Sequence, residues 1–106
     1  MKFSIAFLPE FPIDYALNIV RRADELGFDT FWGADEIYYK DPWQLFALGS
    51  RITKSIKFGP CLAHIYMQDP TMIGRSLATL DETSNGRAVC TLVIGDLMML
   101  EQYGLK

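Results

Sequence analysis

The stretch LDETSNGRAVCTLVIGD, residues 80–96, changes character halfway along. Its first half is polar and stops at Asn85-Gly86, a dipeptide typical of turns. Its second half is a nearly continuous apolar run that ends at Gly95-Asp96. Strands that are apolar on both faces are typical of parallel sheets covered on both sides. The stretch therefore predicts an α/β protein in which Asp96 stands at the carboxyl end of a buried strand.

The same kind of run occurs four times along the chain. The strand-like runs are residues 2–8, 28–34, 56–63 and 87–94. Their starts are about 26 to 31 residues apart, which is the length of one strand, one helix and two loops. Alternating units of this kind predict a parallel sheet. Both an open doubly wound sheet and half of a (β/α)₈ barrel fit, since eight units of about 30 residues reach a typical barrel length.

Helical patterns fill the intervals between these runs. The first has apolar residues at helical spacing and ends at Gly27, where a C-terminal cap belongs. The second and third both open with an N-cap and a proline, Asp41-Pro42 and Asp69-Pro70. The side chains expected on the buried faces are Ala16, Ile19, Val20, Ala23 and Leu26 in the first helix, Leu45, Leu48 and Ile52 in the second, and Ile73, Leu77 and Leu80 in the third.

Composition narrows the class of protein. The chain has 106 residues, half of them hydrophobic and 22% charged, with a net charge of -3. We expect one partial barrel domain over residues 1–106, because no linker or low-complexity segment interrupts the pattern. The scattered basic residues do not predict nucleic-acid binding. No apolar run approaches the roughly 20 residues of a membrane span, and the N-terminus is interpreted as a strand and not a signal peptide.

The cysteines and the histidine give little sign of metal binding. Cys61 and Cys90 lie in separate apolar runs without metal-ligand or Cys-x-x-Cys spacing, and His64 is the one histidine. No metal site is therefore expected, and a reducing cytoplasm fits these cysteines best.

The carboxyl ends of the predicted strands carry the candidate functional residues. Chemistry in parallel α/β folds sits at these ends, where the loops gather. The residues there are Pro9-Glu10, Asp35-Glu36, Cys61-Leu62-Ala63-His64 and Gly95-Asp96. The competing interpretation is structural, since acids in such loops often cap helices. The aromatic residues Trp32, Tyr38, Tyr39 and Trp43 are interpreted as packing residues.

Four segments carry a resemblance to a known family. They are MKFSIAFLPEFP, ADELGFDTFWGADE, SIKFGPCLAHIYMQDP and SLATLDETSNGRAVCTLVIGD. Together they resemble the luciferase-like flavin and deazaflavin oxidoreductases, above all the archaeal methylenetetrahydromethanopterin reductases that use coenzyme F-420. The resemblance runs from Met1 to the last residues and covers the first third of that family's usual length. It implies the N-terminal half of a (β/α)₈ TIM barrel, with four parallel strands.

The resemblance also implies roles for particular residues. In the family, the third strand ends in a bulge with a non-proline cis peptide that backs the cofactor ring, and this falls at Cys61-Leu62. Ala63 and His64 would follow along the cofactor edge, and Gly95 belongs to the fourth-strand end that approaches the ring. Asp35 matches the acidic residue near the cofactor head. Asp96 matches the acid that closes the fourth strand.

The resulting hypothesis is a reductase that transfers hydride between coenzyme F-420, or a flavin such as FMN, and a small organic substrate. Methylenetetrahydromethanopterin is the candidate substrate. Asp96 and Glu36 are the candidates for proton transfer, with Asp35 as orienter. Two alternatives stay open: a truncated, self-associating module without catalysis, and an FMN-dependent monooxygenase. The chain is expected to be a homo-oligomer or a fragment of a longer chain.

Overall fold

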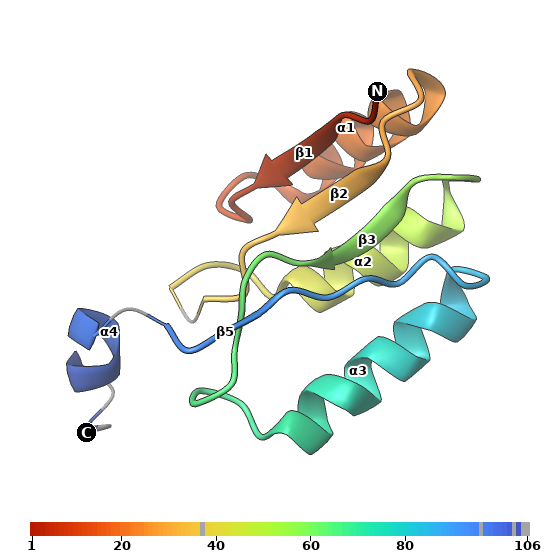
Figure 1. Cartoon of the computed structure of the whole chain (residues 1–106). Helices are drawn as coiled ribbons and strands as arrows, with labels where there is room; N and C mark the ends of the chain where they lie inside the picture. The colour runs from red at the N-terminus through yellow and green to blue at the C-terminus, as the bar shows by residue number, and fades with distance from the viewer. Residues whose placement is uncertain (37, 96, 103, 105–106) are drawn as a thin grey trace.

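The structure, a computed structural model, describes residues 1–36, 38–95, 97–102 and 104. Strands and helices alternate along the chain as the sequence predicts (Figure 1). In order they are β1 (Ser4–Phe7), α1 (Ile13–Glu25), β2 (Thr30–Gly33), α2 (Pro42–Arg51), β3 (Lys57–Pro60), β4 (Ala63–His64), α3 (Pro70–Thr83), β5 (Leu92–Val93) and α4 (Leu97–Gln102).

The strand pairings within the described residues are all parallel. The sheet order is β1-β2-β3, with Ser4 beside Thr30 and Thr30 beside Lys57. A second parallel pair joins β4 to β5, with Ala63 beside Leu92. The chain is thus an α/β protein in which consecutive strands are neighbours, as expected for successive units of a barrel.

The core lies between the sheet and its helices. Figure 1 shows α1 and α2 on one side of β1, β2 and β3, with α3 beside the segment that leads to β5. Phe31 of β2, Phe46 of α2 and Phe58 of β3 are fully buried. The ring centroids of Phe31 and Phe46 lie 6.1 and 6.2 Å from that of Phe58. Burial of these aromatic side chains fixes the helices against one face of the sheet.

The predicted helix starts are confirmed. Asp41 Oδ1 accepts a hydrogen bond from the Trp43 backbone N–H at 2.9 Å, and Asp69 Oδ1 accepts one from the Thr71 N–H at 2.8 Å. The ends also follow the sequence, because Gly27 has a φ of 81° after α1. Asn85 and Gly86 have φ values of 57° and 83° after α3, so the chain leaves the helix there.

The expected buried faces of the first two helices are partly wrong. After α1, Leu26 is 59% exposed. The larger difference is in α2. Leu45 is buried, but Leu48 and Ile52 are 50% and 39% exposed. Phe46 and Gly49 face the core in their place. A Cβ on Gly49 would lie 3.0 Å from the Phe58 ring, so the helix approaches β3 through a residue without a side chain. A pattern of hydrophobic residues does not reveal that a glycine faces the core.

The expectation of one continuous fourth strand over residues 87–94 is also wrong. The segment forms a single bridge, between Ala88 and Phe58, and then the short strand β5. The Phe58 N–H donates to the Arg87 carbonyl at 2.9 Å. The next donor in a parallel ladder would be residue 60, but Pro60 has no N–H. The ladder is interrupted there for that reason.

A bulge follows this interruption, as predicted. The Thr91 N–H donates to the Pro60 carbonyl, and the Thr91 carbonyl accepts from the Ala63 N–H. In a regular parallel ladder that second donor would be residue 62, so one extra residue stands on this strand. The Cys61-Leu62 peptide bond is cis. The predicted departure from strand geometry is therefore confirmed.

Candidate active site

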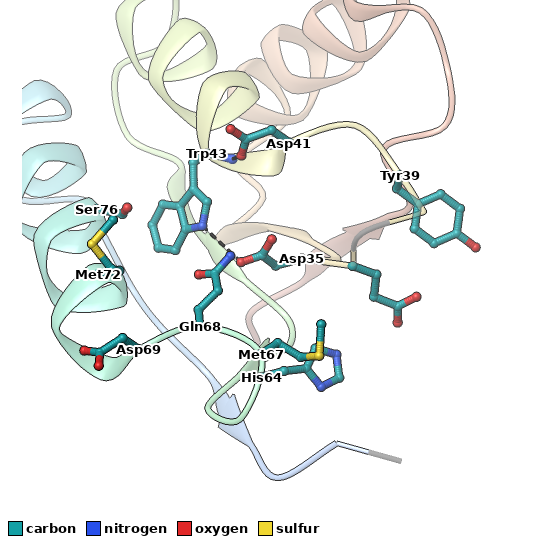
Figure 2. A pocket seen from close by; sticks show the side chains of 11 residues that line it. Asp35, Tyr39, Asp41, Trp43, His64, Met67, Gln68, Asp69, Met72 and Ser76 are labelled. Carbon is teal, nitrogen blue, oxygen red and sulfur yellow. Dashed lines mark hydrogen bonds between the residues drawn. The ribbon is translucent and has the colours of Figure 1, made fainter. Parts of the chain in front are cut away.

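A cavity of about 640 Å³ lies at the carboxyl ends of β2 and β4 (Figure 2). Its walls come from the residues after β2, the first turn of α2, and the segment from β4 into α3. The lining residues are Asp35, Glu36, Tyr39, Asp41, Trp43, His64, Met67, Gln68, Asp69, Met72 and Ser76. The volume lies in the usual range of small-molecule sites.

Asp35 is an acid of this cavity whose pKa is raised. Burial raises the pKa of its carboxyl above the usual range for aspartate, and the nearby Asp41 carboxylate adds to the rise. The hydrogen bond that Trp43 Nε1 donates to Asp35 Oδ2 at 3.1 Å acts the other way, as do His64 and Gln68, without cancelling the effect of burial. Asp35 therefore keeps its proton to a higher pH than an exposed aspartate does.

His64 lies at the bottom of the same cavity and is only 8% exposed. Its position depends on Gly95, which follows β5. Gly95 has a φ of 98°, and a Cβ there would lie 2.9 Å from His64 Nδ1. A residue with a side chain would be strained at this φ and would displace the imidazole. The glycine thus holds open the space that His64 occupies.

The two acids that begin helices have structural roles. Asp41 accepts the Trp43 backbone N–H through Oδ1 and the Gln44 side-chain N–H through Oδ2. Asp69 accepts from Thr71, and these hydrogen bonds lower the pKa of the Asp69 carboxyl. Both carboxylates border the cavity because their helices start there. The N-cap roles that the sequence predicts for Asp41 and Asp69 are therefore confirmed.

The cavity suits an uncharged, partly apolar group. Among the described residues that line it there is no lysine or arginine, so nothing there would pair with an anionic substituent. Met67, Met72 and the Trp43 ring supply apolar surface, while Asp35 and Gln68 supply hydrogen bonds. A carboxyl group with a raised pKa that shares a cavity with a histidine can take part in proton transfer, as an acid–base site requires.

Three of the residues expected from the sequence come together here. Asp35, Glu36 and His64 all line the cavity. Cys61, Leu62 and Ala63 form the bulge that leads directly into His64, with Ala63 fully buried. Gly95 packs against His64. Asp96 lies outside the described residues, so its predicted place at this end of the sheet stays a prediction.

Sequence reasoning missed the contribution of Trp43 and Gln68. Trp43 was interpreted as a packing residue, yet its indole N–H donates to Asp35. Its position just after the Asp41-Pro42 helix start placed it at the same end of the sheet as Asp35. Gln68 precedes the second such start, Asp69-Pro70. The recurrence of this helix start was therefore the signal that could have found both residues.

In the described part of the chain, no group of three or more His, Cys, Asp or Glu residues is arranged to hold a metal ion. None of the helices described is both long enough and apolar enough to cross a membrane.

The sequence matches one protein family over almost its whole length. Residues 1–105 match the family described as luciferase-like monooxygenase. The chain therefore belongs to this family of luciferase-like oxidoreductases.

Within this family, the chain is similar to several reductases of known name. It is 30% identical over 105 residues to the 5,10-methylenetetrahydromethanopterin reductase of Archaeoglobus fulgidus. That match covers 99% of this chain and 32% of the reductase. The chain thus spans about a third of the length of the curated relatives it matches.

Solved structures agree on the fold. The coenzyme F-420-dependent tetrahydromethanopterin reductase of Methanopyrus kandleri matches with a TM-score of 0.92 and 28% identity, over 99% of this chain and 30% of that one. The oxygenating constituent of 3,6-diketocamphane monooxygenase from Pseudomonas putida, solved with FMN, matches with a TM-score of 0.85 and 19% identity, over 100% and 33%. The fold is that of the N-terminal part of a luciferase-like (β/α)₈ barrel.

Proposed function

We propose that this chain supplies part of the active site of an oxidoreductase in which hydride passes between a deazaflavin, coenzyme F-420, and an organic substrate. The observation that carries the proposal is the protonatable Asp35 beside His64, in a cavity at the carboxyl ends of the parallel strands. This is the end of a barrel at which enzymes of this architecture act. Methylenetetrahydromethanopterin, named for the relatives, is the proposed substrate.

The residues present fit the flat ring of such a cofactor. A flat heterocycle requires apolar surface and a few hydrogen-bonding groups, and Met67, Met72, Asp35 and Gln68 supply these. The close approach of Gly95 to His64 leaves room that a Cβ would fill. When bound, the deazaflavin or flavin supplies the hydride chemistry, which protein side chains do not perform.

The chain's own residues would bind, orient and exchange protons. Asp35 would hold a proton near the ring edge, and Trp43 would keep its carboxyl in place. Glu36, which is half-buried in the same wall, would exchange protons with the substrate. Asp96 is proposed as the second proton-transfer group on the basis of the resemblance. Loss of a group in this role costs roughly 10²- to 10⁴-fold in rate.

Two observations support alternative functions. The likeness to an FMN-bound monooxygenase supports an FMN-dependent enzyme of the same fold. The exposed apolar side chains near the C-terminus, Leu92 and Ile94 among them, support a module that acts through self-association.

Binding of the two cofactors distinguishes these functions. We expect coenzyme F-420 to bind more tightly than FMN when each is titrated by absorbance or fluorescence. Asp35→Asn should weaken binding about ten-fold, because one hydrogen bond contributes about 0.5–1.5 kcal/mol. The control is Asp29→Asn, since Asp29 stands at the opposite end of β2 and pairs with Lys2 and Lys57 at 3.8 and 3.7 Å.

Each outcome decides between the candidates. Tighter binding of FMN favours the monooxygenase. Binding of neither cofactor by the folded chain favours the self-associating module. Equal loss in Asp35→Asn and Asp29→Asn contradicts a ring site at Asp35.

A further inference from the structure

Trp43 is held in place by three separate contacts. Its backbone N–H donates to Asp41 Oδ1 at 2.9 Å, which fixes it in the first turn of α2. The edge of its ring meets the buried Phe46, with centroids 5.8 Å apart and an interplanar angle of 81°. Its Nε1–H donates to Asp35 Oδ2 at 3.1 Å. The indole donor is therefore directed at Asp35 before any ligand arrives (Figure 2).

Phe46 connects this arrangement to the sheet. Gly33, the last residue of β2, lies against the Phe46 ring so closely that a Cβ would be 2.8 Å from Phe46 Cζ. Asp35 follows two residues after Gly33. The strand that carries the acid and the helix that carries the indole are thus packed together beside the hydrogen bond. The Trp43 to Asp35 distance is set by the core and not by a flexible loop alone.

An indole is an unusual choice of partner for a carboxyl group. A guanidinium or ammonium group would bring a positive charge and favour the carboxylate. An indole N–H has no charge, so it orients the carboxyl while leaving it able to hold a proton. The other groups that face Asp35 are Asp41, His64, Gln68 and Cys90. Within the described residues that line the cavity there is no lysine or arginine.

The contact also distinguishes the two carboxyl oxygens. In a neutral carboxylic acid the carbonyl oxygen is the better acceptor, and the hydroxyl oxygen bears the proton. When Asp35 is protonated, the indole N–H at Oδ2 favours Oδ2 as the carbonyl oxygen and Oδ1 as the oxygen that bears the proton. We propose that Trp43 is a positioning residue, which fixes Asp35 through Oδ2 and so directs the Asp35 proton to Oδ1. The biological use of that proton rests on the proposed function, but the contact and its consequence do not.

The indole resonances of the folded chain test this proposal without any cofactor. The chain has two tryptophans, Trp32 and Trp43, so Trp32 serves as an internal reference. In a ¹⁵N NMR titration, we expect the Trp43 Nε1–H resonance to shift as Asp35 ionises, with a midpoint above the ~3.9 of an unperturbed aspartate. In Asp35→Asn that step disappears while the resonance itself remains.

A second variant separates positioning from simple packing. Trp43→Phe keeps an aromatic ring but removes the donor that favours the carboxylate, so the midpoint of the Asp35 carboxyl ¹³C resonance should move to higher pH. Trp43→His places a ring N–H there that is positively charged at acidic pH, so it should bring the midpoint down to that of the parent chain or below. Trp32→Phe is the matched control and should leave it unchanged.

The results that would overturn the proposal are specific. An Asp35 midpoint that is the same in Trp43→Phe and the parent chain shows that the indole does not act on the carboxyl. A Trp43 resonance that still shifts at the same midpoint in Asp35→Asn shows that another group is responsible. Failure to bind coenzyme F-420 or FMN leaves both titrations intact, so it contradicts the proposed function and not the role of Trp43.

Discussion

The Cys90 thiol lies near Asp35, in the segment between the Ala88 bridge and β5. Burial raises the pKa of Cys90, and the negative charge of Asp35 adds to this rise. Because the thiolate is the reactive form, a raised pKa and restricted access both slow alkylation. At pH 8 we expect Cys90 to react with iodoacetamide about ten-fold more slowly than a free thiol. The rate is measured in Cys61→Ser, where Cys90 is the one remaining cysteine.

The alkylation rate of Cys90 also tests the effect of the Asp35 charge. In Cys61→Ser combined with Asp35→Asn, the charge that opposes the Cys90 thiolate is gone, so alkylation should become faster. Asp29→Asn, at the other end of β2, should leave the rate unchanged. Alkylation at the rate of a free thiol in the single variant contradicts the burial of Cys90.

Individual site residues could be predicted from the sequence only where their position at the end of a strand was enough to identify them. Asp35, Glu36 and His64 were found because the alternation of strands and helices places them at the carboxyl ends of strands. Trp43 and Gln68 were missed, since a hydrophobic pattern does not give the direction in which an indole N–H points. The bulge at Cys61-Leu62 came from the resemblance to a family and not from any periodicity.

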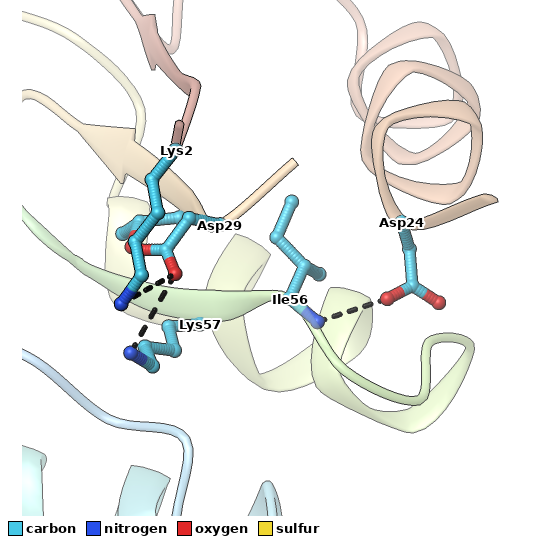
Figure 3. A network of polar contacts seen from close by, with 6 residues as sticks. Lys2, Asp24, Asp29, Ile56 and Lys57 are labelled. Atoms are coloured by element: carbon cyan, nitrogen blue, oxygen red, sulfur yellow. Dashed lines mark hydrogen bonds and ion pairs between the residues drawn. The ribbon is translucent and has the colours of Figure 1, made fainter. Parts of the chain in front are cut away.

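The elements are tied together at the amino ends of the strands (Figure 3). Asp24, in the last turn of α1, accepts the backbone N–H groups of Lys54, Ser55 and Ile56, each at 2.9 Å. Burial raises the pKa of Asp24, but these three hydrogen bonds and the charge of Arg87 outweigh it and lower the pKa. One carboxylate thus connects α1 to the turn that leads into β3.

Arg87 has a similar role at the start of the segment that leads to β5. It donates to the carbonyls of Ser50, Ile56 and Ser84 at 2.7, 2.8 and 2.7 Å. Its guanidinium carbon lies 5.7 Å from the centre of the Phe58 ring. These contacts join the end of α2, the start of β3 and the end of α3. The sequence alone does not show that Arg87 has these carbonyl partners.

We expect Asp24→Ala to lower the free energy of unfolding by about 1–2 kcal/mol, because three backbone donors lose a charged acceptor and the two exposed ones turn to water instead. Urea unfolding at pH 7 measures the change. Glu25→Ala is the control, since Glu25 pairs with Arg22 at 3.2 Å on the exposed surface, and its loss should change stability by less than about 0.5 kcal/mol.

The pH dependence of this effect has a definite sign. The pKa of Asp24 is lower in the folded chain, so its contribution is fully present above the ordinary aspartate value of about 3.9. It is lost as the pH falls through the lower, folded-state pKa. The difference between the parent chain and Asp24→Ala should therefore shrink below pH 4. A constant difference down to pH 2 contradicts the account.

The ends of helices could be predicted best where a capping residue or a turn sequence determines them. Asp41-Pro42, Asp69-Pro70 and Asn85-Gly86 fix helix ends by local backbone chemistry, and the structure agrees at each. The segments 56–63 and 87–94 form short strands and not two continuous ones, because their pairing depends on contacts between residues that are distant in sequence. Pro60 has no N–H to donate to the Val89 carbonyl. Neither segment, considered alone, reveals that this hydrogen bond is missing.

At the scale of the whole molecule, the amino ends of the strands carry stabilising contacts and the carboxyl ends carry the cavity. Asp24 and Arg87 bind backbone groups at the amino ends and hold helices and strands together. The cavity with Asp35 and His64 lies at the carboxyl ends. This division is the one that barrel enzymes show, in which stability resides at one end and chemistry at the other. It allows residues at the site to depart from ideal packing, because the opposite end maintains the fold.

The remaining feature of the whole molecule is its exposed apolar surface. Leu92, Ile94 and Leu97 are 57%, 60% and 77% exposed, and Ala6 on the open face of β1 is exposed too. Burying such side chains contributes about 1.5–3 kcal/mol each for the larger ones, which is a large share of a small domain's stability of about 5–15 kcal/mol. We therefore expect the purified chain to self-associate at micromolar concentration. Light scattering should give a mass above 12.1 kDa that rises with concentration.

Paired substitutions locate the surface responsible. Leu92→Ser with Ile94→Ser should lower the measured mass toward that of one chain, because it removes apolar area beside β5. Leu26→Ser is the matched control, since Leu26 is 59% exposed at the end of α1, away from β5, and its loss should leave the mass unchanged. A folded species of 12.1 kDa at every concentration tested contradicts the expectation. A fall in mass with Leu26→Ser and none with the β5 pair places the contact on the helical side of the molecule instead.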